Sequence, residues 1–167
     1  VGAVPVSISG SGSTTSALDG SFTCPHGGTA PVSMVSQLIG DWVRVENNVA
    51  ANLLVNTPAT PPGPATVSLN PAADALVQSE VNAFHYTNIT HDFFRDRTAA
   101  GNPGIDISIL CNVNILDTCN AFFSPGEQSI NFYQAGGGCV STAYASVISH
   151  EYGHFVVNRL GLSQGGF

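Results

Sequence analysis

The spacing of apolar residues changes near residue 70, and this change limits the folds that are open to the chain. Before residue 70, short alternating apolar runs are separated by Gly, Ser, Thr and Pro, a pattern typical of strands joined by turns. The runs predict strands over 4–9, 32–35, 42–45, 52–56 and 65–69. We therefore expect residues 1–70 to form a β-rich N-terminal subdomain, such as a small β-sandwich, with 57–64 (TPATPPGP) as a linker.

After residue 70 the apolar spacing becomes helical. Val77, Val81 and Phe84 follow the i, i+4, i+7 pattern of a buried helical stripe. This pattern predicts a long helix over 71–97, with Asn70 as a possible N-cap. Further strands are expected over 105–113, 121–123 and 129–133, followed by a second helix over 142–160. The expected fold class is α+β, with residues 71–167 as the second unit.

Charge and hydropathy exclude two classes of partner. Lys and Arg together number 4 against 11 Asp and Glu, which gives a net charge of −7. Without a basic surface the chain would repel a phosphate backbone, so nucleic acid is not expected as a partner. Every apolar run is shorter than the roughly 18 residues that a membrane-spanning helix needs, so no membrane partner is expected either.

The cysteine content favours an oxidising compartment, and hence a secreted protein. The chain has an even number of cysteines and no lysine, and its cysteines are Cys24, Cys111, Cys119 and Cys139. Of the three possible connectivities we favour Cys119–Cys139, which would close a short hairpin region and leave Cys24–Cys111 as the second bridge. A structural zinc bound by all four thiolates would need close C-x2-C pairs, which the sequence lacks.

Residues 150–154 (HEYGH) form an H-E-x-x-H sequence within the second expected helix. Residues four apart on a helix are rotated by about 400°, so His150 and His154 project from one face and can bind one Zn²⁺. Glu151 lies about 100° further round the helix, where it can act as a general base without binding the metal. The motif predicts a zinc peptidase with two histidine ligands and Glu151 as the catalytic residue.

A catalytic zinc needs a third protein ligand. The metzincin pattern would place a glycine and a histidine where this chain has Val157 and Leu160, so that class is excluded. The other common solution is a glutamate on a later helix. His85 and His91 are six residues apart on different faces of the first helix, and we expect them to be ordinary helix histidines rather than ligands.

The segments around the motif resemble those of a known family. Residues 150–160 (HEYGHFVVNRL) resemble the zinc helix of fungalysin-like peptidases. Residues 120–123 (NAFF), with 129–133 and a Gly-rich turn, resemble the active-site edge strand of thermolysin-like gluzincins. Residues 80–95 (EVNAFHYTNITHDFFR) are similar to the long helix before that strand. The resemblance covers about residues 72–160 and implies a zincin-like N-terminal lobe, made of a long helix, a small mixed sheet and the zinc helix.

The resemblance also implies a function, that of a secreted zinc metalloendopeptidase with one catalytic Zn²⁺ and a protein or peptide substrate. Asn120 and Ala121 would bind the substrate backbone as an added strand at the sheet edge. The third ligand would be a glutamate beyond Phe167, so the chain alone is expected to be an incomplete fragment with poor activity, and the remaining C-terminal lobe is its expected partner. Calcium binding is left open. The alternative is a non-catalytic fragment or a binding or adhesion module with an incomplete zinc site, which the β-rich residues 1–70 would suit.

Overall fold

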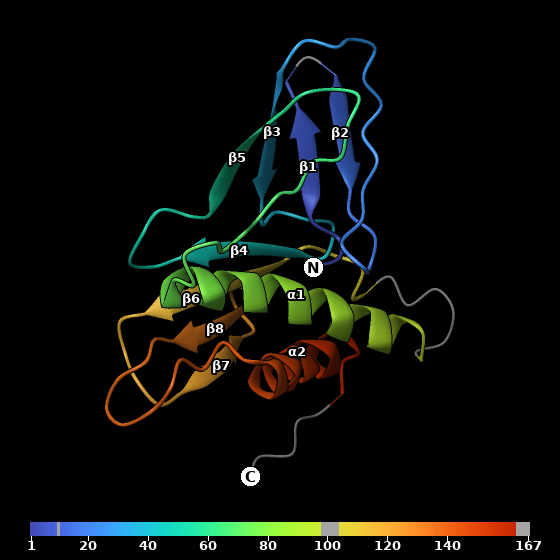
Figure 1. Ribbon diagram of the computed structural model, residues 1–167. Helices are drawn as coiled ribbons and strands as arrows, with labels where there is room; N and C mark the ends of the chain where they lie inside the picture. Colours follow the sequence, from blue (N-terminus) through green and yellow to red (C-terminus); the bar gives the residue numbers. More distant parts are fainter. Residues whose placement is uncertain (10, 98–103, 163–167) are drawn as a thin grey trace.

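The computed structural model describes residues 1–9, 11–97 and 104–162, which form two four-stranded sheets and two helices in a mixed α+β arrangement (Figure 1). The first sheet is antiparallel with the order β2-β1-β3-β5, and its strands are β1 (Pro5–Ile8), β2 (Gly12–Thr15), β3 (Val32–Gln37) and β5 (Leu54–Ala59). The second has the order β4-β6-β8-β7, and its strands are β4 (Val43–Asn47), β6 (Ile109–Ile115), β8 (Ser129–Tyr133) and β7 (Ala121–Ser124). The expected α+β class is confirmed.

The second sheet carries both helices on one face. β4, β6 and β8 run parallel to one another, and β7 joins β8 in the antiparallel direction, so β7 is an edge strand. α1 (Ala75–Arg95) packs against β4 and β6, and α2 (Ala145–Arg159) packs against β7 and β8 and against α1 (Figure 1). The main core fills the space between them, and its buried side chains include Val45, Phe84, Cys111, Phe132, Ile148, Tyr152 and Phe155.

The strand predicted over 42–45 belongs to the second sheet and not to the N-terminal sheet. As β4 it pairs with β6, Val43 beside Ile109 and Val45 beside Cys111. Both valines are buried in the main core. The chain therefore leaves the first sheet after β3, adds β4 to the second and returns to the first at β5 (Figure 1). The predicted division at residue 70 does not separate the two sheets.

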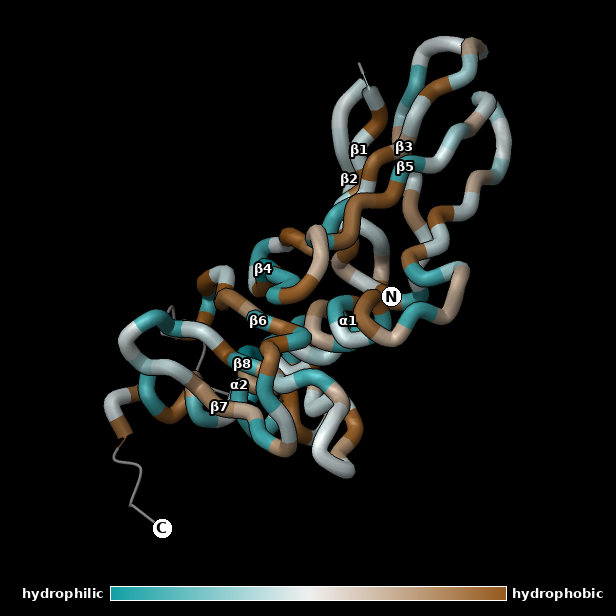
Figure 2. The backbone as a smooth tube through the Cα atoms, turned by 90° about the vertical axis from the view of Figure 1, so that its left-hand side faces the viewer, coloured by the Kyte–Doolittle hydropathy of each residue, from teal (hydrophilic) through white to brown (hydrophobic). Residues whose placement is uncertain are grey.

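The N-terminal sheet also differs in detail from the prediction. Sequence reasoning missed β2, whose first residue, Gly12, has φ +105°, a left-handed conformation that favours glycine. Residues 65–69, expected to be a strand, are coil. They lie across the inner face of the sheet, where Ala65 and Val67 pack against a small core centred on Met34. One sheet covered by coil thus replaces the expected sandwich. Hydrophobic residues recur along β1, β3 and β5 (Figure 2).

α1 begins with a cap that differs from the expected one. The N-cap is Asp74, whose side chain accepts hydrogen bonds from the backbone N–H groups of Leu76 and Val77 at 2.8 and 3.0 Å. Asn70, the predicted cap, instead accepts a hydrogen bond from the N–H of Asp74 at 2.8 Å and so shapes the turn before the helix. The helix then continues without Gly or Pro as far as Arg95.

One of the two expected disulfides is present. Cys119 and Cys139 are bonded, with their Cα atoms 5.3 Å apart, as predicted. The expected Cys24–Cys111 bridge is wrong, because both thiols are free and lie in different cores. Cys111 is buried in the main core, whereas Cys24 packs against the small core of the first sheet.

No helix among the described residues combines the length and the apolar character needed to cross a membrane.

Candidate active site

α2 brings the two histidines of the H-E-x-x-H sequence together. The Nε2 atoms of His150 and His154 lie 3.0 Å apart, and the ring planes make an angle of 87°. Two nitrogens at this separation could both lie within the about 2.0–2.1 Å of one Zn²⁺ that zinc–histidine bonds require. His150 is exposed and His154 is half-buried, so the pair can be reached from the surface. The pair could supply two of the ligands of a zinc ion.

The side chain of Glu151 on α2 faces the edge strand β7. Its side chain is buried, and burial raises the pKa of Glu151, whereas His150 and His154 act in the opposite direction. The backbone N–H of Phe123 on β7 also hydrogen-bonds to the carboxylate and lowers the pKa. The carboxylate is therefore held beside the two imidazoles by a contact with the strand.

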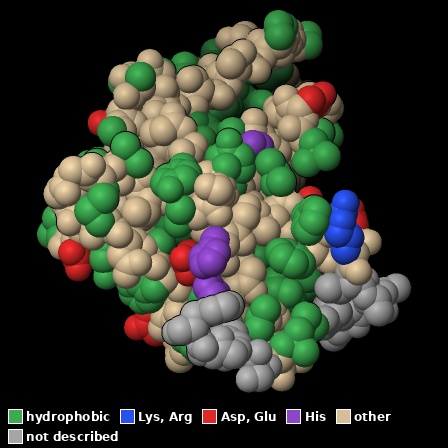
Figure 3. Space-filling view, turned by 90° about the horizontal axis from the view of Figure 1, so that it is seen from below, with side chains coloured by type: hydrophobic (Ala, Val, Ile, Leu, Met, Phe, Trp, Pro, Cys, Tyr) green, Lys and Arg blue, Asp and Glu red, His purple; other side chains and the backbone are tan. Residues whose placement is uncertain are grey.

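A cleft of about 590 Å³ joins the residues that the sequence singled out. It is lined by Asn120, Ala121, Phe122, Phe123, Pro125, His150, Glu151, His154, Asn158 and Leu162. The predicted metal ligands, catalytic carboxylate and substrate-binding residues thus share one cleft, although about 30 positions separate them in sequence. The face seen from below carries histidine side chains beside an acidic side chain (Figure 3).

The backbone of β7 is oriented so that it can receive an extended peptide. The N–H of Tyr133 donates to the carbonyl oxygen of Asn120 at 3.3 Å. Hydrogen-bonding direction alternates along an antiparallel strand, so Ala121 and Phe123 direct their backbone groups away from β8. The hydrogen bond from Phe123 to Glu151 agrees with this direction. The backbone groups of Ala121 therefore face the cleft side of the strand.

Two contacts fix the start of β7. The Cys119–Cys139 disulfide ties the residue before Asn120 to the Gly-rich turn, in which Gly136 and Cys139 exchange backbone hydrogen bonds of 2.9 and 3.0 Å. The hydroxyl of Thr142 donates to the carbonyl of Asn120 at 3.0 Å and accepts from the N–H of Tyr133 at 2.8 Å. The edge strand is thereby held in place relative to the start of α2.

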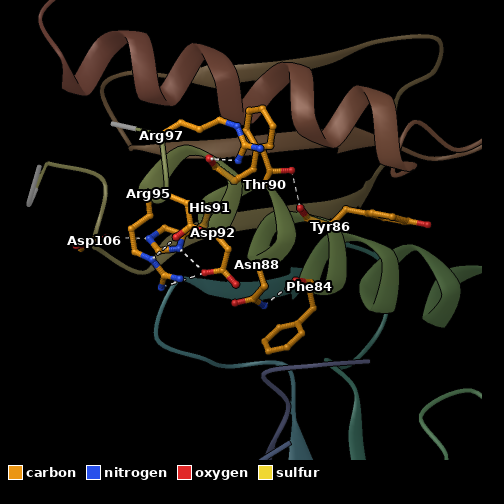
Figure 4. Close-up of polar contacts among 11 residues, drawn as sticks. Phe84, Tyr86, Asn88, Thr90, His91, Asp92, Arg95, Arg97 and Asp106 are labelled. Atoms are coloured by element: carbon orange, nitrogen blue, oxygen red, sulfur yellow. Dashed lines mark hydrogen bonds and ion pairs between the residues drawn. The ribbon is translucent and has the colours of Figure 1, made fainter. Parts of the chain in front are cut away.

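The buried side of α2 rests on α1. Tyr152 projects opposite the two zinc-ligand candidates, is fully buried, and lies edge-on to His91 with ring centroids 6.4 Å apart. His91 is itself buried and bonds to Asp106, as Figure 4 shows. One turn away, the hydroxyls of Thr90 and Ser149 are 2.9 Å apart. These contacts fix the rotation of α2 about its own axis, so that His150 and His154 face away from α1.

Sequence reasoning did not predict the other five lining residues of the cleft as site residues, namely Phe122, Phe123, Pro125, Asn158 and Leu162. Phe123 acts through its backbone N–H, which no side-chain pattern reveals. Asn158 lines the cleft and follows His154 by four residues, so helical spacing alone could have placed it on the same face. The other two helix histidines, His85 and His91, lie outside the cleft lining.

Within residues 1–9, 11–97 and 104–162, no group of three or more His, Cys, Asp or Glu side chains is arranged to hold a metal ion. The described chain thus offers the two histidine donors without a third ligand. Comparisons of the sequence with protein-family models and with curated proteins found no match.

Proposed function

We propose that this chain is the zinc-binding lobe of a secreted endopeptidase of the gluzincin class, similar to the fungalysin and thermolysin families. The observation that carries the proposal is the convergence of His150 and His154 at 3.0 Å beside a buried Glu151, in a cleft walled by an edge strand. Secretion is supported by the Cys119–Cys139 disulfide.

In this proposal each residue of the cleft has a defined task. The Nε2 atoms of His150 and His154 hold one Zn²⁺, and the third ligand is a glutamate from beyond Phe167. When bound, the zinc supplies a Lewis acid that polarises the scissile carbonyl and makes a nearby water more acidic. Glu151 accepts the proton of the attacking water on a carboxylate oxygen and then delivers it to the nitrogen of the leaving amine.

The substrate in this proposal is a protein or peptide in extended conformation. Its backbone pairs with the outward-facing groups of Ala121, while the exposed side chain of Asn120 contacts the next peptide unit. Antiparallel pairing at this edge would lay the scissile bond across the imidazoles, because β7 and α2 line the same cleft. The backbone N–H of Phe123 hydrogen-bonds to Glu151, so it cannot also pair with the peptide backbone.

Zinc binding is the first test. Competition with a chromophoric chelator should show that His150→Gln and His154→Gln each weaken zinc binding at least about tenfold. His85→Gln, on α1 and outside the cleft, is the matched control and should leave the affinity unchanged. Equal affinity in all four proteins would refute the metal site.

Catalysis is tested in the longer protein that includes the expected C-terminal lobe. Glu151→Gln should lower peptide hydrolysis by about 10²–10⁴-fold while the zinc content stays constant. Retained zinc with undiminished hydrolysis would exclude Glu151 as the general base.

A second candidate is a non-catalytic binding or adhesion module that keeps an incomplete zinc site. It is favoured by the lack of a third ligand among the described residues. The two proposals differ in one measurement, because the module predicts that even the longer protein has no chelator-sensitive peptide hydrolysis.

A further inference from the structure

The Cys119–Cys139 disulfide lies at the surface, directly before the edge strand that walls the cleft. Both bonded residues are exposed. The other two cysteines, Cys24 and Cys111, are free thiols that pack into the two separate cores. A thiol in solution can therefore reach the bridge without unfolding either core. The bridge is an accessible covalent tie beside the cleft.

The backbone at Cys119 is held in a conformation that most residues avoid. Its φ is +64°, in the left-handed region where Cβ crowds the following carbonyl oxygen. Such a conformation persists only where the surrounding structure enforces it. Here the bridge to Cys139 ties the side chain, with the two Cα atoms 5.3 Å apart. Opening the bridge would let Cys119 relax, and this relaxation would change the direction in which the chain enters Asn120.

The closed bridge also presses the Gly-rich turn against the residue before Cys119. A Cβ on Gly136 would lie 2.7 Å from Cγ2 of Thr118, and a Cβ on Gly137 would lie 2.9 Å from its Oγ1. The Sγ atom of Cys119 lies 3.8 Å from the carbonyl oxygens of both glycines. Two segments that touch this closely have little freedom to move while the bridge is closed.

The cleft begins at the next residue. Asn120 lines the cleft, and its carbonyl oxygen accepts hydrogen bonds from the hydroxyl of Thr142 at 3.0 Å and from the N–H of Tyr133 at 3.3 Å. The pairing of β7 with β8 starts one residue later, at Ala121. Once the bridge opens, two hydrogen bonds and no covalent tie hold Asn120 against its neighbours.

The histidine pair is held by a different set of contacts. His150 and His154 lie on α2, which packs on α1 through the ring of Tyr152 and the hydroxyl of Ser149. None of these contacts involves the bridge. Opening the bridge should therefore loosen the peptide-binding strand and leave the two imidazoles in place.

We propose that the Cys119–Cys139 bridge is a redox switch that controls peptide binding at β7. The switch rests on the proposed peptidase function, since it regulates the same cleft. In the disulfide form Asn120 and Ala121 are held in position to pair with an extended peptide. In the dithiol form the start of β7 is loose, so a peptide must order the strand as it binds and its affinity falls.

The reductant is a dithiol in solution. One of its thiolates attacks Sγ of Cys139, because the two carbonyl oxygens beside Sγ of Cys119 would repel an anion. The bridge breaks, a mixed disulfide forms, and Cys119 leaves as a thiolate. The second thiol of the reductant then attacks the reductant's own sulfur in the mixed disulfide and releases Cys139. The bridge gains two electrons, the dithiol loses two and becomes a disulfide, and its two protons end on the two cysteines.

The first test needs no catalysis and uses this chain. Amide hydrogen exchange is followed by NMR at neutral pH, with and without excess reduced dithiothreitol. We expect the dithiol to speed exchange at Phe122 and Tyr133 at least about tenfold and to leave exchange at Cys111 in β6 unchanged. The double variant Cys119→Ser, Cys139→Ser is the control, and dithiothreitol should not alter its exchange. Unaltered exchange at Phe122 and Tyr133 in the parent would overturn the switch.

The second test uses the longer protein that includes the expected C-terminal lobe. Thiolates of dithiothreitol bind zinc, so the double variant replaces the reduced enzyme in this measurement. Its KM for an extended peptide should rise about five- to tenfold, while kcat changes less than about twofold and the zinc content stays the same. Val140→Ser, in the same turn but with the bridge intact, should keep the parent KM. An unchanged KM in the double variant would overturn the switch, whereas absence of hydrolysis in the parent would refute the peptidase function and leave the exchange test to decide whether the bridge holds the strand.

Discussion

The imidazole of His91 lies parallel to the indole of Trp42, with ring centroids 4.2 Å apart and an interplanar angle of 11°. The ring is fully buried, and its nitrogens face two carboxylates, Nε2 at 2.9 Å from Asp106 and Nδ1 at 3.3 Å from Asp92 (Figure 4). The ring also lies edge-on to that of Tyr152 on α2. His91 therefore joins α1, the residue before β4, the segment before β6 and α2 at one point.

Replacing His91 by Leu should lower the free energy of unfolding by about 1–3 kcal/mol, because the apolar side chain fills the space but loses the hydrogen bond to Asp106. Urea unfolding at neutral pH measures the change. His85→Leu, on the same helix but only half-buried, is the matched control and should change stability by less than about 1 kcal/mol. Equal losses in both variants would mean that His91 has no special role in joining the elements.

Removing the Cys119–Cys139 disulfide should destabilise the chain by about 3 kcal/mol, since the bridge closes a loop across a sequence separation of 20. The double variant Cys119→Ser, Cys139→Ser should also show faster amide hydrogen exchange at Asn120 and Ala121, because the start of β7 loses its covalent tie. Val140→Ser, at a 71% exposed position in the same turn, is the control. Unchanged exchange in the double variant would show that the Thr142 hydrogen bonds suffice to hold the strand.

Burial raises the pKa of the Cys111 thiol to about 12, from an ordinary value of 9.0. The folded-state pKa is raised, so the stabilising contribution is complete below pH 9.0 and is lost as the pH rises towards 12. The free energy of unfolding should fall by about 1.4 kcal/mol per pH unit in this window. Urea unfolding between pH 8 and 10 should show little change below pH 9.0 and the onset of this fall above it in the parent, and a smaller fall in Cys111→Val. Burial also raises the pKa of Tyr152 above its ordinary value of 10.0. Tyr152 should therefore add a similar loss of stability above pH 10, so the measurements end at pH 10.

The two free thiols should also differ in reactivity. Iodoacetamide at neutral pH should alkylate the half-buried Cys24 and leave Cys111 unmodified, because Cys111 is fully buried and its thiolate is disfavoured. Peptide mapping by mass spectrometry reads the result directly. Alkylation of both thiols at equal rates in the folded chain would contradict the buried position of Cys111.

Gly153 lies inside α2, between the two zinc-ligand candidates, and a Cβ there would meet no atom within 4 Å. Gly153→Ala should therefore raise the free energy of unfolding by about 0.5–1 kcal/mol, since alanine restricts the unfolded chain and favours the helix. Gly136→Ala is the opposite case, because its Cβ would lie 2.7 Å from Thr118 and should destabilise the turn. Thermal unfolding of both variants tests the pair, and a loss of stability in Gly153→Ala would show that the helix needs glycine there.

Local patterns predicted both helices and most of the strands, but not which sheet each strand joins. The helical spacing around Phe84 and His154 was enough to place α1 and α2, because one buried face repeats every turn. The alternation of Val43 and Val45 predicts a strand but carries no information about which sheet it joins. The pairing of this strand with β6 depends on the main core, which is assembled from residues far apart in the sequence.

The remaining differences have similar physical causes. Asn70 and Asp74 both carry suitable cap side chains, and the turn between them decided which one caps α1. The Cys24–Cys111 pairing failed because the two residues enter separate cores, which cysteine counting cannot reveal. In the site, spacing along one helix was enough to pair His150 with His154, whereas the Phe123 N–H reaches Glu151 only through the position of β7.

The path of β4 restricts where this chain can be divided into separate pieces. A piece that folds by itself must carry all the strands of its sheet. Here the second sheet takes a strand from a stretch flanked on both sides by strands of the first. A chain starting at residue 71 would lack Val43 and Val45 and would leave one edge of β6 without its neighbour. The second sheet and its helices therefore cannot be separated from the amino-terminal strands by cutting the chain at residue 70.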